Sequence, residues 1–284
     1  MTPRVVSGNN GMPKVALSHP SGASADVYLS GAHCTSWIPA GGEEVLFMGK
    51  TATFAPGEPI RGGIPVVFPQ FANTGPLSQH GFARKSEWKV SEGEEQAEDE
   101  SSVTLELLDD HRTRELWPHH FRAELSLTLG ERSLEVKLGV INIGDDVFTF
   151  TSALHTYLSV TDIRETVIRG FGGKWYVDKT HGGIEVKDEA KKFTVSDEMD
   201  RVYIKGPKKV EVEDRGGSRR IQVHATGFKD SVVWNPWVEK VTGFIGLDTD
   251  DYLRMICVES AQIGSPVELK PGAAWSGAQT LSIV

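Results

Sequence analysis

Two arginines bracket a segment rich in glycine and proline, "RGGIPVVFPQFANTGPLSQHGFAR", which runs from Arg61 to Arg84. Glycine permits close backbone approach and proline restricts the chain, so the segment predicts a stiff, turn-rich loop that is poor core material. Each guanidinium is a planar fork that matches phosphate or carboxylate oxygens. Two fixed forks in a chain of net charge -9 predict a local anion site. Pairing of both arginines with surface carboxylates is the alternative that this pattern leaves open.

The segment contains no Walker motif, and the chain has no glycine-rich dinucleotide motif. The anion is therefore expected to belong to a small substrate and not to a nucleotide.

A histidine occupies the stretch "FTFTSALHTYLSV", residues 148 to 160. Alternate side chains of a strand point to opposite faces. The register places His155 on a polar face together with Thr149, Thr151, Tyr157 and Ser159. A face with hydroxyl and aromatic groups but no charged residues suits a groove the size of a sugar. A structural histidine is the alternative.

A glutamate follows an apolar run in "YLRMICVESA", residues 252 to 261. Both faces of this run are apolar, which predicts a central strand buried on both sides. Glu259 is expected at the end of that strand. Burial disfavours the charged carboxylate and raises its pKa, which suits a general base. A salt-bridged glutamate is the alternative.

Asp200 precedes another short strand in "SDEMDRVYIKG", where an aspartate is often only a turn residue. Trp234 and Trp237 flank an Asn-Pro turn in "VVWNPWVEK". Tryptophan faces can stack on sugars, although packing in a core is their commoner role.

Period-two alternation dominates the chain, as in "FRAELSLTL" and "SLEVKLGV", and it indicates strands. A short helix is expected within residues 109–118, and an acidic surface loop or hairpin tip within residues 91–102. The pattern predicts an all-β protein: a large antiparallel β-sandwich with a few short helices, forming one domain over residues 1–284.

Composition excludes several classes of protein. The net charge of -9 argues against a general nucleic-acid surface, and no apolar run is long enough to span a membrane. The N-terminus does not resemble a signal peptide. Cys34 and Cys257 are expected to be free thiols, which indicates the cytoplasm. His111, His119 and His120 lack a convincing set of co-ligands, so no metal site is expected.

Six motifs occur in order: "RGGIPVVFPQF", "QHGFAR", "ALHTYLSV", "MDRVY", "WNPW" and "CVESA". Together they resemble the hexose-6-phosphate mutarotases, or glucose-6-phosphate 1-epimerases, of the galactose-mutarotase-like superfamily. The resemblance implies the galactose-mutarotase-like supersandwich, a sugar in an open groove, a hexose 6-phosphate substrate and no cofactor. We also expect a monomer. The residues that the resemblance assigns are His155 as general acid, Glu259 as general base, His80 and Asp200 as sugar contacts, and Arg61 and Arg84 as phosphate ligands. Gln79, in the same motif as His80, is expected to bind the substrate as well.

Two positions depart from the family's pattern: Lys85 stands where asparagine is expected, and Ala72 where glycine is usual. Two other functions remain open. A glycosidase would use two facing carboxylates, for which Asp200 and Glu259 are the available pair. A non-catalytic sugar-phosphate-binding or regulatory protein could share the fold.

Overall fold

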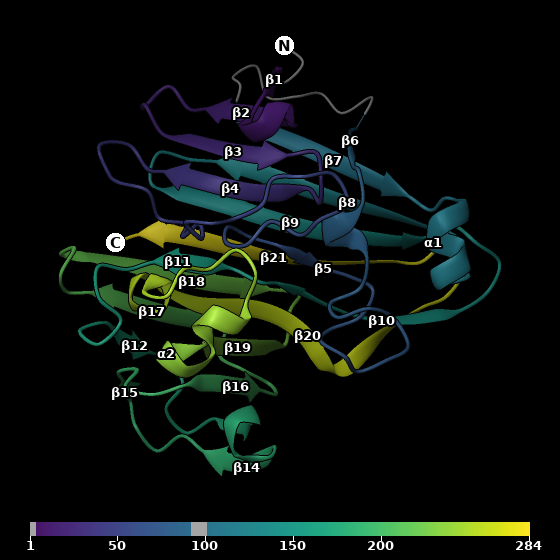
Figure 1. Cartoon of the computed structure of the whole chain (residues 1–284). Helices are drawn as coiled ribbons and strands as arrows, with labels where there is room; N and C mark the ends of the chain where they lie inside the picture. Colours follow the sequence, from purple (N-terminus) through teal and green to yellow (C-terminus); the bar gives the residue numbers. More distant parts are fainter. Residues whose placement is uncertain (1–3, 92–100) are drawn as a thin grey trace.

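A computed structural model describes residues 4–91 and 101–284 of the chain. It contains antiparallel sheets of four, nine and eight strands, with short helices in the connections (Figure 1). The predicted all-β class and large antiparallel sandwich are therefore confirmed.

The four-stranded sheet is formed by the N-terminal part of the chain. Its strands are adjacent in chain order: β1 (Val5–Ser7), β2 (Pro13–Ser18), β3 (Ser24–Tyr28) and β4 (His33–Ile38).

The nine-stranded sheet contains the clearest alternating strands of the sequence. Its spatial order is β15 (Lys192–Phe193), β12 (Val167–Arg169), β17 (Lys209–Asp214), β18 (Arg219–Thr226), β21 (Ala274–Ile283), β9 (Ser133–Asn142), β8 (Phe121–Leu129), β7 (Ser102–Leu108) and β6 (Lys89–Val90). Leu125 of β8 lies opposite Leu138 of β9, and both are fully buried. The predicted apolar faces of these two strands are thus the faces that enter the core.

The eight-stranded sheet carries the site described below. Its order is β14 (Ile184–Lys187), β13 (Trp175–Asp178), β16 (Met199–Tyr203), β19 (Asp230–Asn235), β20 (Met255–Leu269), β10 (Phe148–Leu154) and β5 (Val66–Val67), and β11 (Tyr157–Ser159) also pairs with β20. The main core contains apolar residues from all three sheets.

The helices are short: η1 (Asn9–Gly11), η2 (Ala83–Lys85), α1 (His111–Leu116), η3 (Lys179–His181), α2 (Trp237–Lys240), η4 (Val241–Gly243) and η5 (Asp251–Arg254). The helix expected within residues 109–118 is α1. It begins after Asp110, whose carboxylate accepts a hydrogen bond of 2.8 Å from the Thr113 amide. No helix in the described residues is long and apolar enough to cross a membrane.

The acidic segment 91–102 lies mostly outside the described residues, since 92–100 are not covered. The strands on either side, β6 and β7, pair with each other.

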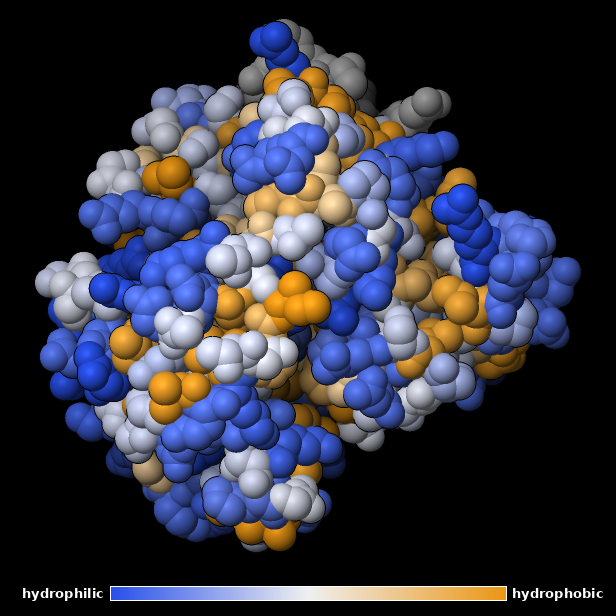
Figure 2. Space-filling model, viewed as in Figure 1, coloured by the Kyte–Doolittle hydropathy of each residue, from blue (hydrophilic) through white to orange (hydrophobic). Residues whose placement is uncertain are grey.

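In the view of Figure 2 the surface is largely hydrophilic, with separate apolar patches.

The interpretation of residues 61–84 as poor core material is wrong for part of the segment. Ile64, Val66, Val67 and Phe68 are completely buried. Val66 and Val67 form β5 and pair with β10, and the ring of Phe68 packs against other core aromatic rings. The glycine and proline turns thus enclose a short apolar edge strand.

Two strand boundaries also differ from the predictions. Residues 148–160 do not form one strand, because β10 ends at Leu154 and β11 begins at Tyr157. Glu259 does not end its strand, since β20 continues to Leu269 while it pairs with β10. The predicted central position of this strand is confirmed, because β19 and β10 flank it.

Candidate active site

The floor of the candidate site is one face of the eight-stranded sheet. Asp200 of β16 lies opposite Trp234 of β19, while Val202 lies opposite Val232, which in turn lies opposite Glu259 of β20. Residues directly opposite each other in neighbouring strands present their side chains to the same face. The register therefore places two carboxylates and an indole on one side of the sheet. The other side belongs to the core.

A cavity of about 410 Å³ opens over this face. Its lining includes every predicted site residue: His155, Glu259, Arg61, His80, Arg84, Asp200 and Gln79. The remaining lining residues are Phe71, Ala72, Asn73, Thr74, Tyr157, Lys179, Val202, Val232, Trp234 and Phe244. The volume is large enough for a single sugar ring with a phosphate. Residues 61–84 thus reach across from the sheet edge and supply the second wall.

The turn that follows Arg61 is held by close backbone contacts. His33 is fully buried, and its Nε2 lies 2.7 Å from the carbonyl oxygen of Gly62. Gly63 has φ +61°, and a Cβ at that position would lie 2.2 Å from the carbonyl oxygen of Cys34. Only glycine fits there. These contacts fix the backbone from which the Arg61 side chain extends.

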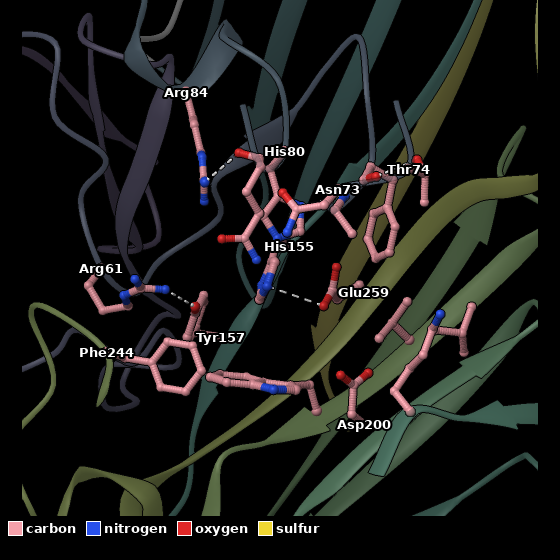
Figure 3. A pocket seen from close by; sticks show the side chains of 17 residues that line it. Arg61, Asn73, Thr74, His80, Arg84, His155, Tyr157, Asp200, Phe244 and Glu259 are labelled. Atoms are coloured by element: carbon pink, nitrogen blue, oxygen red, sulfur yellow. Dashed lines mark hydrogen bonds and ion pairs between the residues drawn. The ribbon is translucent and has the colours of Figure 1, made fainter. Parts of the chain in front are cut away.

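His155 and Glu259 meet at the centre of the cavity (Figure 3). Nε2 of His155 lies 3.4 Å from Oε1 of Glu259. The two residues are 9% and 3% exposed. Nδ1 of His155 and Oε2 of Glu259 have no hydrogen-bond partner among the described residues. The pair therefore has polar atoms available for a bound molecule.

His155 lies in the break between β10 and β11 and lines the cavity. The next residue, Thr156, donates its hydroxyl hydrogen to Oε1 of the buried Gln279, and its carbonyl accepts a 3.1 Å hydrogen bond from the Val258 amide. Gln279 also donates to Oγ of Ser260. This buried network ties the break to β20 and β21.

Burial governs the protonation of the pair. It raises the pKa of Glu259 well above its ordinary value, and the nearby Asp200 raises it further. Burial likewise lowers the pKa of His155, with additional lowering from His80, Arg61 and Arg84. Both shifts favour a proton on the carboxyl group of Glu259 over a proton on the imidazole of His155.

His80 forms an edge-to-face contact with His155, with ring centroids 5.5 Å apart. Its Nδ1 accepts a hydrogen bond of 3.2 Å from the Ala72 amide. Burial lowers its pKa to about 3, and the guanidinium of Arg84 lowers it next. A neutral imidazole that accepts at Nδ1 carries its hydrogen on Nε2. His80 is thus a neutral N–H donor on the wall of the cavity.

Asp200 lies inside β16, not ahead of it as the sequence suggested. Burial raises its pKa to about 6, and the ammonium of Lys179 partly opposes that rise. The carboxyl group is therefore mostly ionised at pH 7. In Figure 3 it lies on the opposite side of the His155–Glu259 pair from the two arginines.

Arg61 is held by three contacts. Its Nε donates to the carbonyl oxygen of Ile245 at 3.1 Å, and its Nη1 donates to the hydroxyl of Tyr157 at 3.3 Å. Its guanidinium lies 5.5 Å from the ring centroid of Phe244. None of these partners is a carboxylate.

Arg84 donates from Nη2 to the backbone carbonyl of Gln79 at 2.8 Å. Its Nε is buried and has no partner in the described chain. Burial lowers its pKa to about 10, and Arg61 contributes to that lowering. Within the described residues, neither arginine has a carboxylate within ion-pair distance. The alternative in which both pair with surface carboxylates is therefore wrong, and two cations face one cavity.

Sequence reasoning missed several lining residues. The sequence pattern indicates Tyr157 only as a neighbour of His155 on one strand face, and Trp234 only as a residue that could stack on a sugar; both line the cavity. Phe244 and Lys179 also line the cavity. Neither belongs to a local motif, and Lys179 is the first residue of η3. Trp237 packs against Tyr252 and does not line the cavity.

The two departures from the family pattern differ in position. Lys85 is exposed and outside the cavity lining. Ala72 lines the cavity with φ +48°, a conformation that glycine adopts more easily.

The remaining sequence candidates lie elsewhere. Cys34 and Cys257 are free and buried. His111 and His120 pair with Glu115 and Asp109, respectively. Among the described residues, no three histidine, cysteine or acidic side chains are grouped so that they could hold a metal ion.

Comparisons with known proteins agree with this geometry. The family model described as aldose 1-epimerase matches residues 13–282. A protein of Cenchrus ciliaris, named as a candidate glucose-6-phosphate 1-epimerase, is 34% identical over 99% of this chain and 87% of its own. A protein of Escherichia coli K12 with the same name is 34% identical over 87% of this chain and 82% of its own.

A solved structure is also closely similar. The crystal structure of a candidate mutarotase (YeaD) from Salmonella typhimurium covers 99% of this chain and 97% of its own. Its TM-score is 0.87 at 28% sequence identity. The match to the family model spans nearly the whole chain, so the resemblance seen in the motifs is confirmed. The chain belongs to the aldose 1-epimerase family.

Proposed function

We propose that this protein interconverts the α and β anomers of a hexose 6-phosphate, with glucose 6-phosphate as the expected substrate. The observation that carries the proposal is the cavity itself, in which two arginines without carboxylate partners lie to one side of a buried His155–Glu259 pair. The names of the relatives from Cenchrus ciliaris and Escherichia coli support the same substrate.

In the proposed mechanism, Glu259 is the general base and His155 is the general acid. Glu259 takes the proton of the C1 hydroxyl while His155 gives a proton to the ring oxygen. The C1–O5 bond breaks and the C1–O bond becomes a carbonyl. Rotation about C1–C2 presents the other face of the aldehyde, and the same steps in reverse close the ring. The chemistry requires no metal or cofactor.

One proton serves both directions of the reaction. The cyclic sugar reacts with ionised Glu259 and protonated His155, and ring opening leaves the carboxyl protonated and the imidazole neutral. Burial shifts the free pair in the direction of this second arrangement, because it raises the pKa of Glu259 and lowers that of His155. Ring closure therefore starts from the arrangement that these shifts favour. Ring opening starts from the other arrangement, in which the proton lies on His155, whose Nε2 is 3.4 Å from Oε1 of Glu259.

The phosphate anchors the sugar away from the reacting carbon. Arg61 and Arg84 would bind its oxygens, while His80, Gln79 and Asp200 would contact the sugar hydroxyls. Binding energy gained remote from C1 holds the sugar in position for proton transfer. General acid–base catalysis contributes roughly 10²–10⁴-fold per group.

The proposal includes one domain over residues 1–284, a monomer, and a place in the cytoplasm. The free, buried thiols of Cys34 and Cys257 support a reducing compartment. Light scattering after size-exclusion chromatography measures the oligomeric state.

The experiment that tests the function is NMR exchange spectroscopy on the two anomers of glucose 6-phosphate at neutral pH. Wild type should speed their exchange above the buffer rate, and Glu259→Gln should not. If wild type only broadens the signals of the sugar, the protein is a sugar-phosphate-binding protein. If instead it releases sugar from an aryl glycoside, the glycosidase reading replaces the proposal.

A further inference from the structure

Tyr157 connects the arginine side of the cavity to the His155–Glu259 pair. It lines the cavity although it is only 2% exposed. Its ring is stacked on the imidazole of His155, with centroids 4.9 Å apart and an interplanar angle of 13°. Its hydroxyl accepts the hydrogen bond from Nη1 of Arg61 (Figure 3). One side chain therefore touches both an expected phosphate ligand and the expected general acid.

The hydroxyl of Tyr157 keeps a hydrogen of its own. Burial raises the pKa of the phenol above its ordinary value, so it is neutral at pH 7. A hydroxyl that accepts from a guanidinium can still donate its O–H. Within residues 4–91 and 101–284, that O–H donates to no side-chain or backbone acceptor. Buried tyrosine hydroxyls usually donate to a partner, and the residue that carries this hydroxyl lines the cavity.

The position of this hydroxyl is fixed by the backbone. The Tyr157 amide donates to the carbonyl oxygen of Gly63 at 2.9 Å, and its carbonyl accepts from the Phe47 amide at 3.0 Å. Tyr157 also pairs with Cys257 of β20. Gly63 belongs to the turn that follows Arg61, so the hydroxyl and the guanidinium are anchored to the same short piece of chain. Two donors anchored in this way are pre-organised for one acceptor group.

We propose that Tyr157 is a substrate-binding residue that donates its phenolic hydrogen to a phosphate oxygen of the bound sugar phosphate, beside Arg61. The inference rests on the proposed function and deepens it. A phosphate oxygen is a charged acceptor, and hydrogen bonds to charged groups are stronger than neutral ones. A free sugar offers no charged acceptor at that point. Tyr157 thus helps to select phosphorylated hexoses.

The variant Tyr157→Phe tests the proposal because it removes the hydroxyl and keeps the ring that stacks on His155. We expect the KM for glucose 6-phosphate to rise about tenfold to a hundredfold, the range for one lost hydrogen bond to a charged acceptor. The kcat should stay within about threefold, and kcat/KM for free glucose within about twofold, as is typical when uniform binding is lost.

Tyr28→Phe is the matched control. The hydroxyl of Tyr28 accepts from the Asn9 amide at 2.9 Å, and it lies outside the cavity lining. Its loss should leave the KM for glucose 6-phosphate unchanged. Thermal unfolding of both variants checks that any change in KM does not come from misfolding.

A binding measurement separates this inference from the proposed function. The probe is 1,5-anhydroglucitol 6-phosphate, which keeps the ring and the phosphate but has no C1 hydroxyl and cannot open. Calorimetry should give a Kd for Tyr157→Phe that is about tenfold to a hundredfold weaker than that of wild type. This comparison of Kd values does not depend on catalysis. If wild type does not speed anomer exchange, the proposed function fails, but the Kd values still show whether the Tyr157 hydroxyl contacts the ligand.

Two results would overturn the inference. An unchanged Kd for the probe in Tyr157→Phe means that the hydroxyl does not contact the ligand. An equal loss in kcat/KM for glucose and for glucose 6-phosphate means that it contacts the sugar ring and not the phosphate.

Discussion

Replacement of Arg61 by methionine removes the guanidinium but keeps an unbranched apolar stem. The stem matters because it packs closely against Gly246, where an added Cβ would lie 2.7 Å from Cβ of Arg61. A guanidinium has five N–H donors. Two are already used, by the carbonyl of Ile245 and the hydroxyl of Tyr157. Three remain, and the planar fork can give two of them to one phosphate.

Each such charge-assisted hydrogen bond contributes about 1.5–3 kcal/mol. Arg61 is only half-buried, and solvent screening weakens exposed charge pairs, so the lower value applies to both bonds. The sum is about 3 kcal/mol, which corresponds to roughly a hundredfold rise in KM for glucose 6-phosphate in Arg61→Met. The kcat should change by less than about threefold, because the lost contacts are remote from C1.

The assay is anomer exchange by NMR over a range of substrate concentrations. Arg61→Lys is the matched control, because it keeps the charge and the stem but loses the planar fork; its KM should lie between those of wild type and Arg61→Met. Free glucose is the second control and should be little affected. An unchanged KM for glucose 6-phosphate, or an equal loss for both sugars, would refute the assignment of Arg61 to the phosphate.

Three further outcomes follow from the geometry. The pKa of His155 lies below the ordinary value of 6.5, so kcat/KM should fall on the acid side only below that pH, where the His155–Glu259 pair gains a second proton. Arg61→Met removes a cation that lowers the pKa of His155. The acid limb of the pH–rate profile should therefore move to higher pH in this variant. Asp200→Asn removes an anion that raises the pKa of Glu259, so the alkaline limb of the pH–rate profile should move to lower pH. The KM should also rise about tenfold, because a hydrogen bond to a sugar hydroxyl is lost. If neither variant shifts the limb of its pH–rate profile, the electrostatic account is contradicted. Gln279→Leu leaves its buried polar partners unsatisfied, so urea denaturation should show a free energy of unfolding lower by about 1–3 kcal/mol, and unchanged stability would mean that this network is dispensable.

The sequence by itself determined which residue types face the same side of each strand. A period-two pattern is local, since it depends only on the alternation of side chains along one strand. This pattern correctly predicted the apolar faces of β8 and β9 and the buried strand that contains Glu259. The motifs around Arg61, Arg84, His155 and Glu259 have the residue types and the order that are typical of the family. The family could therefore be identified from the sequence alone.

The boundaries of these elements were less well determined. Local pattern placed Glu259 at a strand end, but pairing with β10 continues to Leu269. It also joined residues 148–160 into one strand, whereas a buried network through Gln279 stabilises the break after Leu154. Both differences come from partners more than a hundred residues away in the chain, which no local window contains.

Only the tertiary structure decided which groups meet and how they ionise. The order β16, β19, β20 brings Asp200 and Glu259 to one face, and the strand break brings Nε2 of His155 to 3.4 Å from Glu259. The shifts in the pKa values of both groups then follow mainly from burial, which is a property of the folded structure and not of either residue. The role inferred for Tyr157 has the same origin, because its contacts with Arg61 and His155 exist only once the turn after Arg61 is folded against β11.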